Sequence, residues 1–277
     1  MSPKEDTLDQ KSTTNPLDVP VGGGMALPRP GTPETLALEI PTRRPVVVMV
    51  DADATRAAAR ETWRKALTGL AAHRGTSVVI VSARPIDRIR EEPGLDEIAV
   101  LGLGQAAYSP RAGEVRNLIG SDDAKGLVTK VRDALRRILE GRENFIVEDR
   151  GLSVVVHSAL ADKSVAAGVA EAWREAVAAI DTEGRLETST GPSAVEVRAA
   201  GAGKGDLVTK VLETDFSGAM PVYLADELGG EDGFVAMGGK ALTIIMAAKP
   251  RPTHARSRLA PEAAPEFLGI ISRRPTG

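Results

Sequence analysis

The sequence predicts an α/β protein in which a parallel sheet is interrupted by a smaller α+β insertion. Apolar, β-branched runs at 46–50 and within 77–85 are typical of strands buried on both faces of a parallel sheet. A helical pattern at 56–75 separates them, and this strand, helix, strand order indicates right-handed crossovers. From 119 to 199 the pattern changes to helices alternating with pairs of strands, which indicates an inserted unit.

The other expected elements follow from the same periodicities. A third strand of the parallel layer is expected at 97–104. In the insertion we expect a charged helix at 121–141, a hairpin at 143–158, a helix at 163–181 and short strands at 185–191 and 193–199. The parallel pattern then resumes with a helix at 204–214, strands at 221–227 and 241–247, and a closing helix at 257–272.

These patterns divide the chain into four parts. Residues 1–43 are rich in Pro, Gly, Thr, Ser and charge and show no period, so we expect a disordered tail. The first part of the core domain is expected at 44–118, the inserted domain at 119–199, and the second part of the core at 200–277.

Composition excludes several classes of function. The net charge is −3, no basic stretch stands out, and aromatic residues make up 3%, so we expect no nucleic-acid partner. There is no cysteine, and therefore no disulfide or thiolate site. No apolar run approaches the ~20 residues that span a bilayer, and the polar N-terminus lacks the apolar core of a secretory signal. We expect a cytoplasmic protein without membrane contact.

Polar side chains follow the expected strands where each strand ends. Asp51 and Asp53 follow the first strand, Ser82 the second, and Asp226 a later one, while Lys204 opens a helix after a Gly-rich turn. In open α/β sheets the carboxyl ends of the strands form the active crevice. These groups could therefore converge on one phosphate.

Each residue type suits a step of phosphate-ester hydrolysis. The Asp51 carboxylate can attack phosphorus, and Asp53 can protonate the leaving oxygen and then activate water. Asp51, the carbonyl of Asp53 and Asp226 offer the hard oxygen ligands that Mg²⁺ prefers. Lys204 and Ser82 would hold the phosphate oxygens.

Taken singly, these residues have more ordinary interpretations. Acids at a strand end are commonly a solvated turn or loop edge, and Ser82 in SARP is good helix N-cap chemistry. A single Lys204 would be a surface lysine. Their joint order along an α/β chain favours the phosphate site.

Several motifs resemble one family over about residues 45–272. DADAT, SAR, Lys204-Gly205 and the Leu-Ala-Asp226-Glu227 stretch resemble the four motifs of haloacid dehalogenase-type phosphatases. The finer match is to trehalose-6-phosphate phosphatases, and it is carried by VEDRGLSVVVHS, AVEVRAAGAGKGDLV, PVYLADELGGEDGF and PTHARSRLAPEAAPEFL.

The resemblance implies a Rossmann-like haloacid dehalogenase core with an inserted, mobile α+β cap domain. It also implies Mg²⁺ as cofactor, trehalose and phosphate as products, and a trehalose-phosphate synthase as a partner. By position, Asp51 would be the nucleophile, Asp53 the acid and base, and Asp226 a metal ligand.

The resemblance also implies substrate-binding residues. Glu148, Arg150 and Glu196 fall where cap residues of the family contact sugar hydroxyls, and Arg84 belongs to the SAR motif.

The motifs depart from the family pattern in ways that keep two alternatives open. Glu227 and Gly230 replace acids of the fourth motif, and Arg150 replaces the usual Lys. The substrate could accordingly be another sugar phosphate, a glycosyl-glycerate or sucrose phosphate. A catalytically weakened relative that regulates a synthase is the other alternative.

Overall fold

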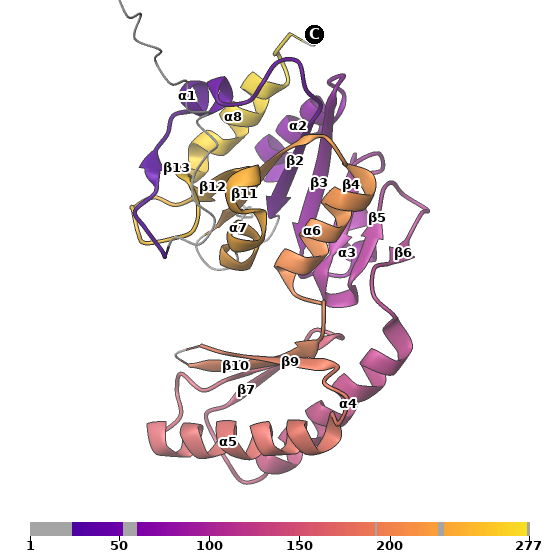
Figure 1. The fold of residues 1–277 in the computed structure, drawn as a ribbon, viewed down its shortest axis with the longest axis vertical. Coiled ribbons are helices and arrows are strands. Elements are labelled where there is room, and N and C mark those ends of the chain that lie inside the picture. The colour runs from indigo at the N-terminus through magenta and orange to yellow at the C-terminus, as the bar shows by residue number, and fades with distance from the viewer. Residues whose placement is uncertain (1–23, 52–59, 192, 227–229, 276–277) are drawn as a thin grey trace, which may run out of the picture.

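The computed structural model of the chain describes residues 24–51, 60–191, 193–226 and 230–275. The chain forms two units that lie one above the other in Figure 1. The core is built on a nine-stranded sheet, and the insert (residues 121–199) is built on a separate four-stranded sheet.

The central strand of the core sheet ends at the candidate nucleophile. The first seven strands in spatial order are parallel, and the last two add an antiparallel edge. The strands in spatial order are β1 (Arg29–Pro30), β13 (Ser257–Leu259), β12 (Leu242–Met246), β11 (Met220–Asp226), β2 (Val46–Asp51), β3 (Thr76–Ser82), β4 (Ala99–Gly102), β5 (Ala107–Ser109) and β6 (Arg116–Asn117).

Helices cover both faces of this sheet. One face carries α1 (Pro33–Leu38), α2 (Arg60–Ala71), α3 (Ile86–Arg90) and α8 (Ala264–Ile271), and the other carries α6 (Lys204–Asp215) and α7 (Glu231–Met237). In β2, Val48 and Val50 pack into the first layer while Val47 and Met49 pack into the second. This burial on both faces explains the continuous apolar run of β2.

The sheet of the insert has one covered face and one face toward the core. Its strands, in the order β7 (Ile146–Asp149), β8 (Ser153–His157), β10 (Ala194–Ala199) and β9 (Leu186–Thr190), are all antiparallel. The helices α4 (Ser121–Ile138) and α5 (Lys163–Ile180) cover the side away from the core (Figure 1). Trp173 of α5 is fully buried and donates a hydrogen bond to the Val131 carbonyl at 3.2 Å.

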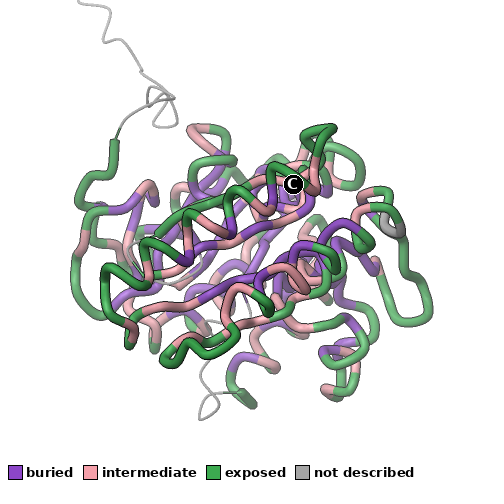
Figure 2. Tube along the Cα trace, turned by 90° about the horizontal axis from the view of Figure 1, so that it is seen from below, coloured by how far each residue is buried: buried purple, intermediate pink, exposed green. Residues whose placement is uncertain are grey.

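Alternation along β10 separates these two faces. Val195 and Val197 are buried toward the helices, whereas Glu196 and Arg198 are only partly buried and line a cleft between insert and core. Figure 2, which views the molecule from the side of the insert, shows exposed residues along the outer faces of the helices and buried residues inside.

The predicted fold class is confirmed, and every strand and helix expected in the core and insert between 46 and 247 has a counterpart. The expectation of disorder does not hold for residues 24–43. β1 pairs with β13, and α1 begins at a capping box on Thr32 and buries Leu36 against the helices of its layer. The low apolar content of this segment obscured a short helix that buries Pro33, Leu36 and Ala37 and leaves Leu38 exposed. Residues 1–23 lie outside the described part.

The end of the chain also differs from expectation. Residues 257–259 form strand β13, and the closing helix α8 begins only at Ala264. Within the described residues, none of the helices combines the length and apolar character that a membrane crossing requires.

Candidate active site

A buried ion pair joins two residues that are 153 positions apart. Asp51, at the end of β2, is 1% exposed, and its Oδ2 lies 2.5 Å from the Nζ of Lys204 at the start of α6. A buried carboxylate without a counter-charge is strongly unfavourable, so the ammonium of Lys204 stabilises Asp51 in its ionised form. Gly205 lets the start of α6 pack closely against α7, because a Cβ there would lie 2.7 Å from the Asp232 carbonyl oxygen of α7.

Asp51 and Lys204 lie in a cleft of about 450 Å³ between the core and the insert. The volume is within the range of ordinary small-molecule sites. The cleft is lined by Asp51, Ala83, Leu103, Gly104, Arg150, Ser153, Glu196, Arg198, Ala202, Lys204, Asp226, Glu231 and Asp232.

Asp226 brings a second core carboxylate to this cleft. It ends β11, the direct neighbour of β2, and Leu224 pairs with Val50 two residues before it. Asp51 and Asp226 therefore come from adjacent strand ends, as the strand-end pattern predicts. Two hard carboxylate donors at one edge fit Mg²⁺ chemistry.

Two of the residues in the motifs around these carboxylates cannot be placed. Asp53, the expected acid and base, and Glu227 lie outside the described residues. In the ranges that the structure does describe, no group of three or more His, Asp or Glu side chains forms a metal-binding cluster.

Gly230, which replaces a family acid, is closely packed in this chain. A Cβ at this position would lie 2.7 Å from the ring of Phe234 and 2.8 Å from the Cβ of Ala225. An acidic side chain would require both neighbours to shift. The packing around position 230 therefore fits glycine better than an acidic side chain.

Ser82 and Arg84 do not line the cleft, although their motif predicts that they do. Ser82 is fully buried at the end of β3, and its Oγ accepts the backbone N–H of Arg84 at 3.1 Å. The guanidinium of Arg84 donates to Glu92 at 3.0 Å. Among the described residues of the SAR motif, it is Ala83 that lines the cleft. Pro85 precedes α3, so Ser82 is not its N-cap.

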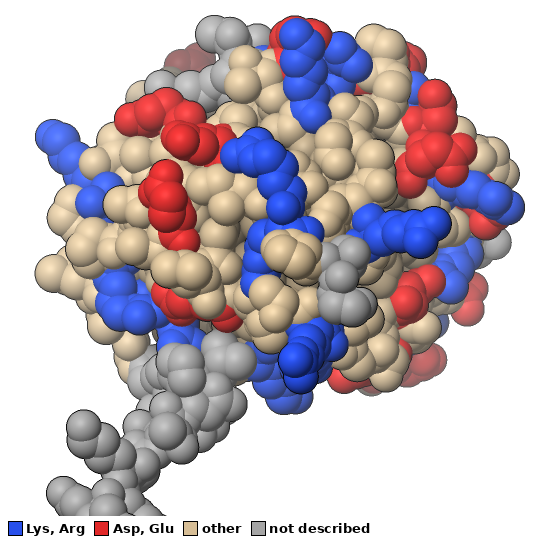
Figure 3. All heavy atoms as spheres, turned by 90° about the horizontal axis from the view of Figure 1, so that it is seen from above, with Lys and Arg blue, Asp and Glu red and all other residues tan. Residues whose placement is uncertain are grey.

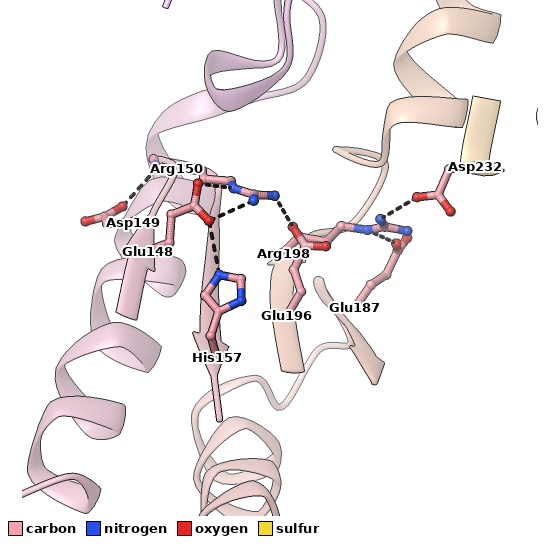
Figure 4. Close-up of polar contacts among 9 residues, drawn as sticks. Glu148, Asp149, Arg150, His157, Glu187, Glu196, Arg198 and Asp232 are labelled. Carbon is pink, nitrogen blue, oxygen red and sulfur yellow. Dashed lines mark hydrogen bonds and ion pairs between the residues drawn. The ribbon is translucent and has the colours of Figure 1, made fainter. Parts of the chain in front are cut away.

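The three expected sugar-binding residues form one network on the core-facing side of the insert (Figure 4). Arg150 donates two hydrogen bonds to Glu148, Nε to Oε1 at 2.9 Å and Nη2 to Oε2 at 2.8 Å. Its Nη1 lies 3.9 Å from Glu196. The hydrogen bonds from Arg150 lower the pKa of Glu148, and His157 adds to this effect.

Only two of these three residues line the cleft. Arg150 and Glu196 do so, while Glu148 does not line the cleft and contacts Arg150. The bidentate contact restricts the guanidinium plane, which is the geometric advantage of Arg over Lys. Glu148 therefore positions Arg150.

Arg198 is a cleft residue that the sequence reasoning did not single out. It donates from Nε to Glu187 at 3.0 Å, and its Nη1 lies 3.5 Å from the carboxylate of Asp232 (Figure 4). Arg198 and Glu187 belong to the insert, and Asp232 belongs to α7 of the core. The signal was present in the sequence, because Arg198 follows Glu196 by two residues and must share its face of β10.

Glu231 is a second cleft residue that sequence reasoning missed. Its carboxylate accepts hydrogen bonds from the backbone N–H and Nδ1 of His254, both at 3.0 Å, and from Arg251 at 3.3 Å. Burial alone would raise the pKa of Glu231, but the hydrogen bonds from Thr253, His254 and Arg251 outweigh it and lower the pKa. Glu231 thereby ties the segment before β13 to the cleft.

Backbone contacts also hold the insert against the core. The N–H of Leu152, in the turn between β7 and β8, donates to the Gly104 carbonyl at 3.3 Å. A Cβ at Gly104 would lie 2.8 Å from the Arg150 carbonyl oxygen and 3.0 Å from that of Ala83. Gly151 adopts a φ of 84° in the same contact. The two glycines let the backbones approach closely.

Comparison with known protein families shows to which family this chain belongs. The family model for trehalose-phosphatase matches residues 48–261, which is more than half of the chain. The chain belongs to the trehalose-phosphatase family. No curated protein sequence matches this chain. Membership of this family confirms the resemblance to haloacid dehalogenase-type phosphatases and the prediction of a phosphatase.

Solved structures with a similar fold include two trehalose-6-phosphate phosphatases and a trehalose synthase regulatory protein. A crystal form of Aspergillus fumigatus trehalose-6-phosphate phosphatase matches with a TM-score of 0.71 and 21% identity over 88% of this chain and 98% of that chain. The C-terminal domain of Candida albicans trehalose-6-phosphate phosphatase matches with a TM-score of 0.65 and 18% identity over 89% and 99%. The C-terminal domain of a Candida albicans trehalose synthase regulatory protein matches with a TM-score of 0.66 and 11% identity over 90% and 100%.

Proposed function

We propose that this member of the trehalose-phosphatase family hydrolyses trehalose 6-phosphate to trehalose and phosphate through a phospho-aspartate on Asp51. The observation that carries the proposal is the buried Asp51–Lys204 pair in a cleft whose opposite wall presents Arg150 and Glu196. The nucleophile would meet the phosphoryl group, and the insert would meet the sugar.

The reaction would proceed in two displacements. An Oδ of Asp51 attacks phosphorus, and the bond between phosphorus and the sugar oxygen breaks while Asp53 gives that oxygen a proton. Asp53, now ionised, takes a proton from water as the water oxygen attacks the same phosphorus. The bond between phosphorus and Asp51 then breaks, which releases phosphate and restores both carboxyl groups.

Lys204 would act throughout as the fixed cation beside the reacting phosphoryl group, and Ser82 would act through its hydrogen bond to the backbone of Arg84. The carboxylates of Asp51 and Asp226 and the carbonyl of Asp53 would hold Mg²⁺, which supplies positive charge to the phosphate oxygens. The donor chemistry of the two described carboxylates supports this assignment.

The insert would serve as the cap. Arg150 and Glu196 would exchange hydrogen bonds with sugar hydroxyls, and Glu148 would position Arg150. The hydrogen bond from Arg84 to Glu92 supports a positioning role for Arg84 in place of direct contact with substrate.

The deciding experiment measures phosphate release from a panel of sugar phosphates, with Mg²⁺ and with chelator. We expect trehalose 6-phosphate to be the best substrate and chelator to abolish turnover. Asp51→Asn should be inactive with an unchanged circular dichroism spectrum, because an amide is a very poor nucleophile. Wild-type phosphate release by Asp51→Asn would refute the mechanism.

The same panel separates the alternatives. Arg150 in place of Lys favours testing a glycosyl-glycerate phosphate and sucrose phosphate, and faster release from either would assign that compound as the substrate. The close packing at Gly230 favours testing the regulatory alternative. Binding of trehalose 6-phosphate without turnover would support a regulator, and copurification with a trehalose-phosphate synthase would support that partner. A cytoplasmic location stays a prediction.

Variants of the cap test its role in substrate choice. Alanine at Arg150 or Glu196 should lower kcat/KM for the sugar phosphate about tenfold or more, as loss of a charged hydrogen bond implies. Hydrolysis of para-nitrophenyl phosphate, which needs no sugar contacts, should change little. An equal fall for both substrates would assign these residues to the fold or to the chemistry.

A further inference from the structure

A basic pocket lies at the end of the core opposite the cleft. It has a volume of about 160 Å³ and is formed by three separate segments, 41–46, 73–76 and 271–275. Its lining includes Arg43, Arg44, Arg74, Arg274 and His73, and it contains no Asp or Glu. Figure 3 views this end of the molecule, with Lys and Arg gathered around the middle of the face and the larger acidic groups toward its rim.

The four arginines lack carboxylate partners within the described residues. Arg44 donates to the carbonyls of Gly218 and Ala219 at 2.7 and 3.2 Å, and Arg274 donates to the carbonyl of Ile40. A neutral carbonyl group orients a guanidinium group but does not neutralise its charge. Most arginines of the core and insert pair with acids, for example Arg88 with Glu91 and Arg111 with Glu114. The pocket is therefore a concentration of uncompensated positive charge.

Part of this charge is shielded from water. Burial lowers the pKa of Arg274, and no described carboxylate opposes that effect. Arg43 and Arg74 line the pocket and are exposed. Two guanidinium groups are thus fixed by backbone carbonyls, and two more can close over a bound anion.

His73 holds this arrangement together. Its Nε2 lies 2.8 Å from the Arg274 carbonyl and its Nδ1 lies 3.2 Å from the Oγ1 of Thr76. Because a carbonyl only accepts, Nε2 donates to the Arg274 carbonyl, while Nδ1 faces the Thr76 hydroxyl. His73 links the C-terminal segment to the turn before β3, which places Arg274 near Arg74.

The size and chemistry of the pocket select one class of ligand. Its volume exceeds the share of a single water, about 30 Å³. It is well below the roughly 300–1,000 Å³ of a typical small-molecule site. Guanidinium groups match tetrahedral oxyanions through paired N–H donors. We propose that this pocket is a binding site for a free tetrahedral oxyanion, inorganic phosphate, separate from the substrate cleft.

The two sites are at opposite ends of one strand. Val46, the first residue of β2, lines the basic pocket, and Asp51, its last residue, lines the cleft. Five residues of extended strand separate them by about 17 Å. One phosphate cannot occupy both sites.

Isothermal titration of the full chain with inorganic phosphate, against chloride at equal ionic strength, tests the proposal. The double variant Arg43→Ser/Arg74→Ser should weaken binding at the pocket about tenfold or more. The matched control is Arg88→Ser/Arg111→Ser, which removes the same charge from exposed arginines elsewhere. Both variants keep the cleft, so phosphate bound there contributes equally to each titration. Equal phosphate binding by the two variants would overturn the proposal.

Chemical labelling gives a second readout that depends on location. Phenylglyoxal modification, mapped by mass spectrometry of peptides, should slow severalfold at Arg43 and Arg74 when phosphate is present. Arg111, which is exposed, pairs with Glu114 and does not line the pocket, should be labelled at the same rate with and without phosphate. Labelling of Arg43 and Arg74 that phosphate leaves unchanged would exclude the pocket as its site.

Discussion

The Asp51–Lys204 pair allows a quantitative test of what holds the candidate nucleophile in its ionised form. Asp51 is 1% exposed and Lys204 is 14% exposed, and their atoms approach to 2.5 Å. Lys204→Met keeps the aliphatic length of the side chain and removes the charge. Breaking a buried pair by removing one partner costs about 3–5 kcal/mol, because the other charge is left uncompensated. We expect a loss near the lower limit, about 3 kcal/mol, since the cleft borders solvent.

A double-mutant cycle isolates that loss, with the free energy of unfolding measured in urea by circular dichroism. In an Asp51→Asn background, Lys204→Met should cost about 1 kcal/mol or less, because an amide needs no counter-charge. Lys130→Met, on the exposed face of α4, is the control and should change stability by less than about 0.5 kcal/mol. Equal losses in the two backgrounds would show that the pair does not stabilise Asp51.

Three further predictions concern the supports of the site. The carboxylate of Glu231 has a pKa below its ordinary 4.5, so its stabilising contribution is present above that value and is lost as the pH falls through the lower, folded-state pKa. The difference in melting temperature between wild type and Glu231→Gln should thus be full at pH 7 and shrink below pH 4.5; a difference independent of pH, or the same trend in the exposed control Glu262→Gln, would contradict this. Gly104→Ala should lower the free energy of unfolding by about 1–3 kcal/mol and reduce turnover, because the new Cβ meets two backbone oxygens. Gly126→Ala, which meets nothing within 4 Å on helix α4, should be neutral or slightly stabilising, and equal losses would refute the argument. A chain starting at residue 24 should be as stable in urea as the full chain. A chain starting at residue 44 lacks the buried side chains of Leu36 and Ile40, so its free energy of unfolding should be lower by about 3 kcal/mol or more. Equal stability of the chains starting at 24 and at 44 would count against packing of α1 on the core.

The elements of the fold were predictable where a local pattern determines them. The β-branched run ending at Asp51 is compatible with a strand buried on both faces and with little else. The alternation in 193–199 likewise predicted one apolar and one polar face, and Glu196 lies on the polar one. Segment 24–43 was predicted to be disordered because its buried residues Leu36, Ala37 and Ile40 become informative only when the helix packs against α8 and β1 pairs with β13.

The sequence predicted the edge of the parallel sheet on which the site lies. Strand ends in a parallel sheet share one edge, which brought Asp51 and Asp226 together in the prediction and in the structure. The pairing of Arg84 with Glu92 was not predictable, because the direction of a long side chain depends on neighbours from other elements. The contact of Arg198 with Asp232 was equally hidden, since it joins an insert strand to a core helix.

By itself the sequence determined the α/β class, the order of the elements, the interruption by an insert and the residue types at the strand ends. These properties depend on periodicity and composition, which act over a few residues. Only the tertiary structure decided that Lys204 contacts Asp51 and that Glu148 positions Arg150 by accepting its hydrogen bonds. It also decided that four arginines from three segments meet at the end of the core opposite the cleft. Such contacts depend on strand register and on the close packing of α6 against α7 at Gly205. A one-residue shift in register, or a larger residue at position 205, would move these groups apart.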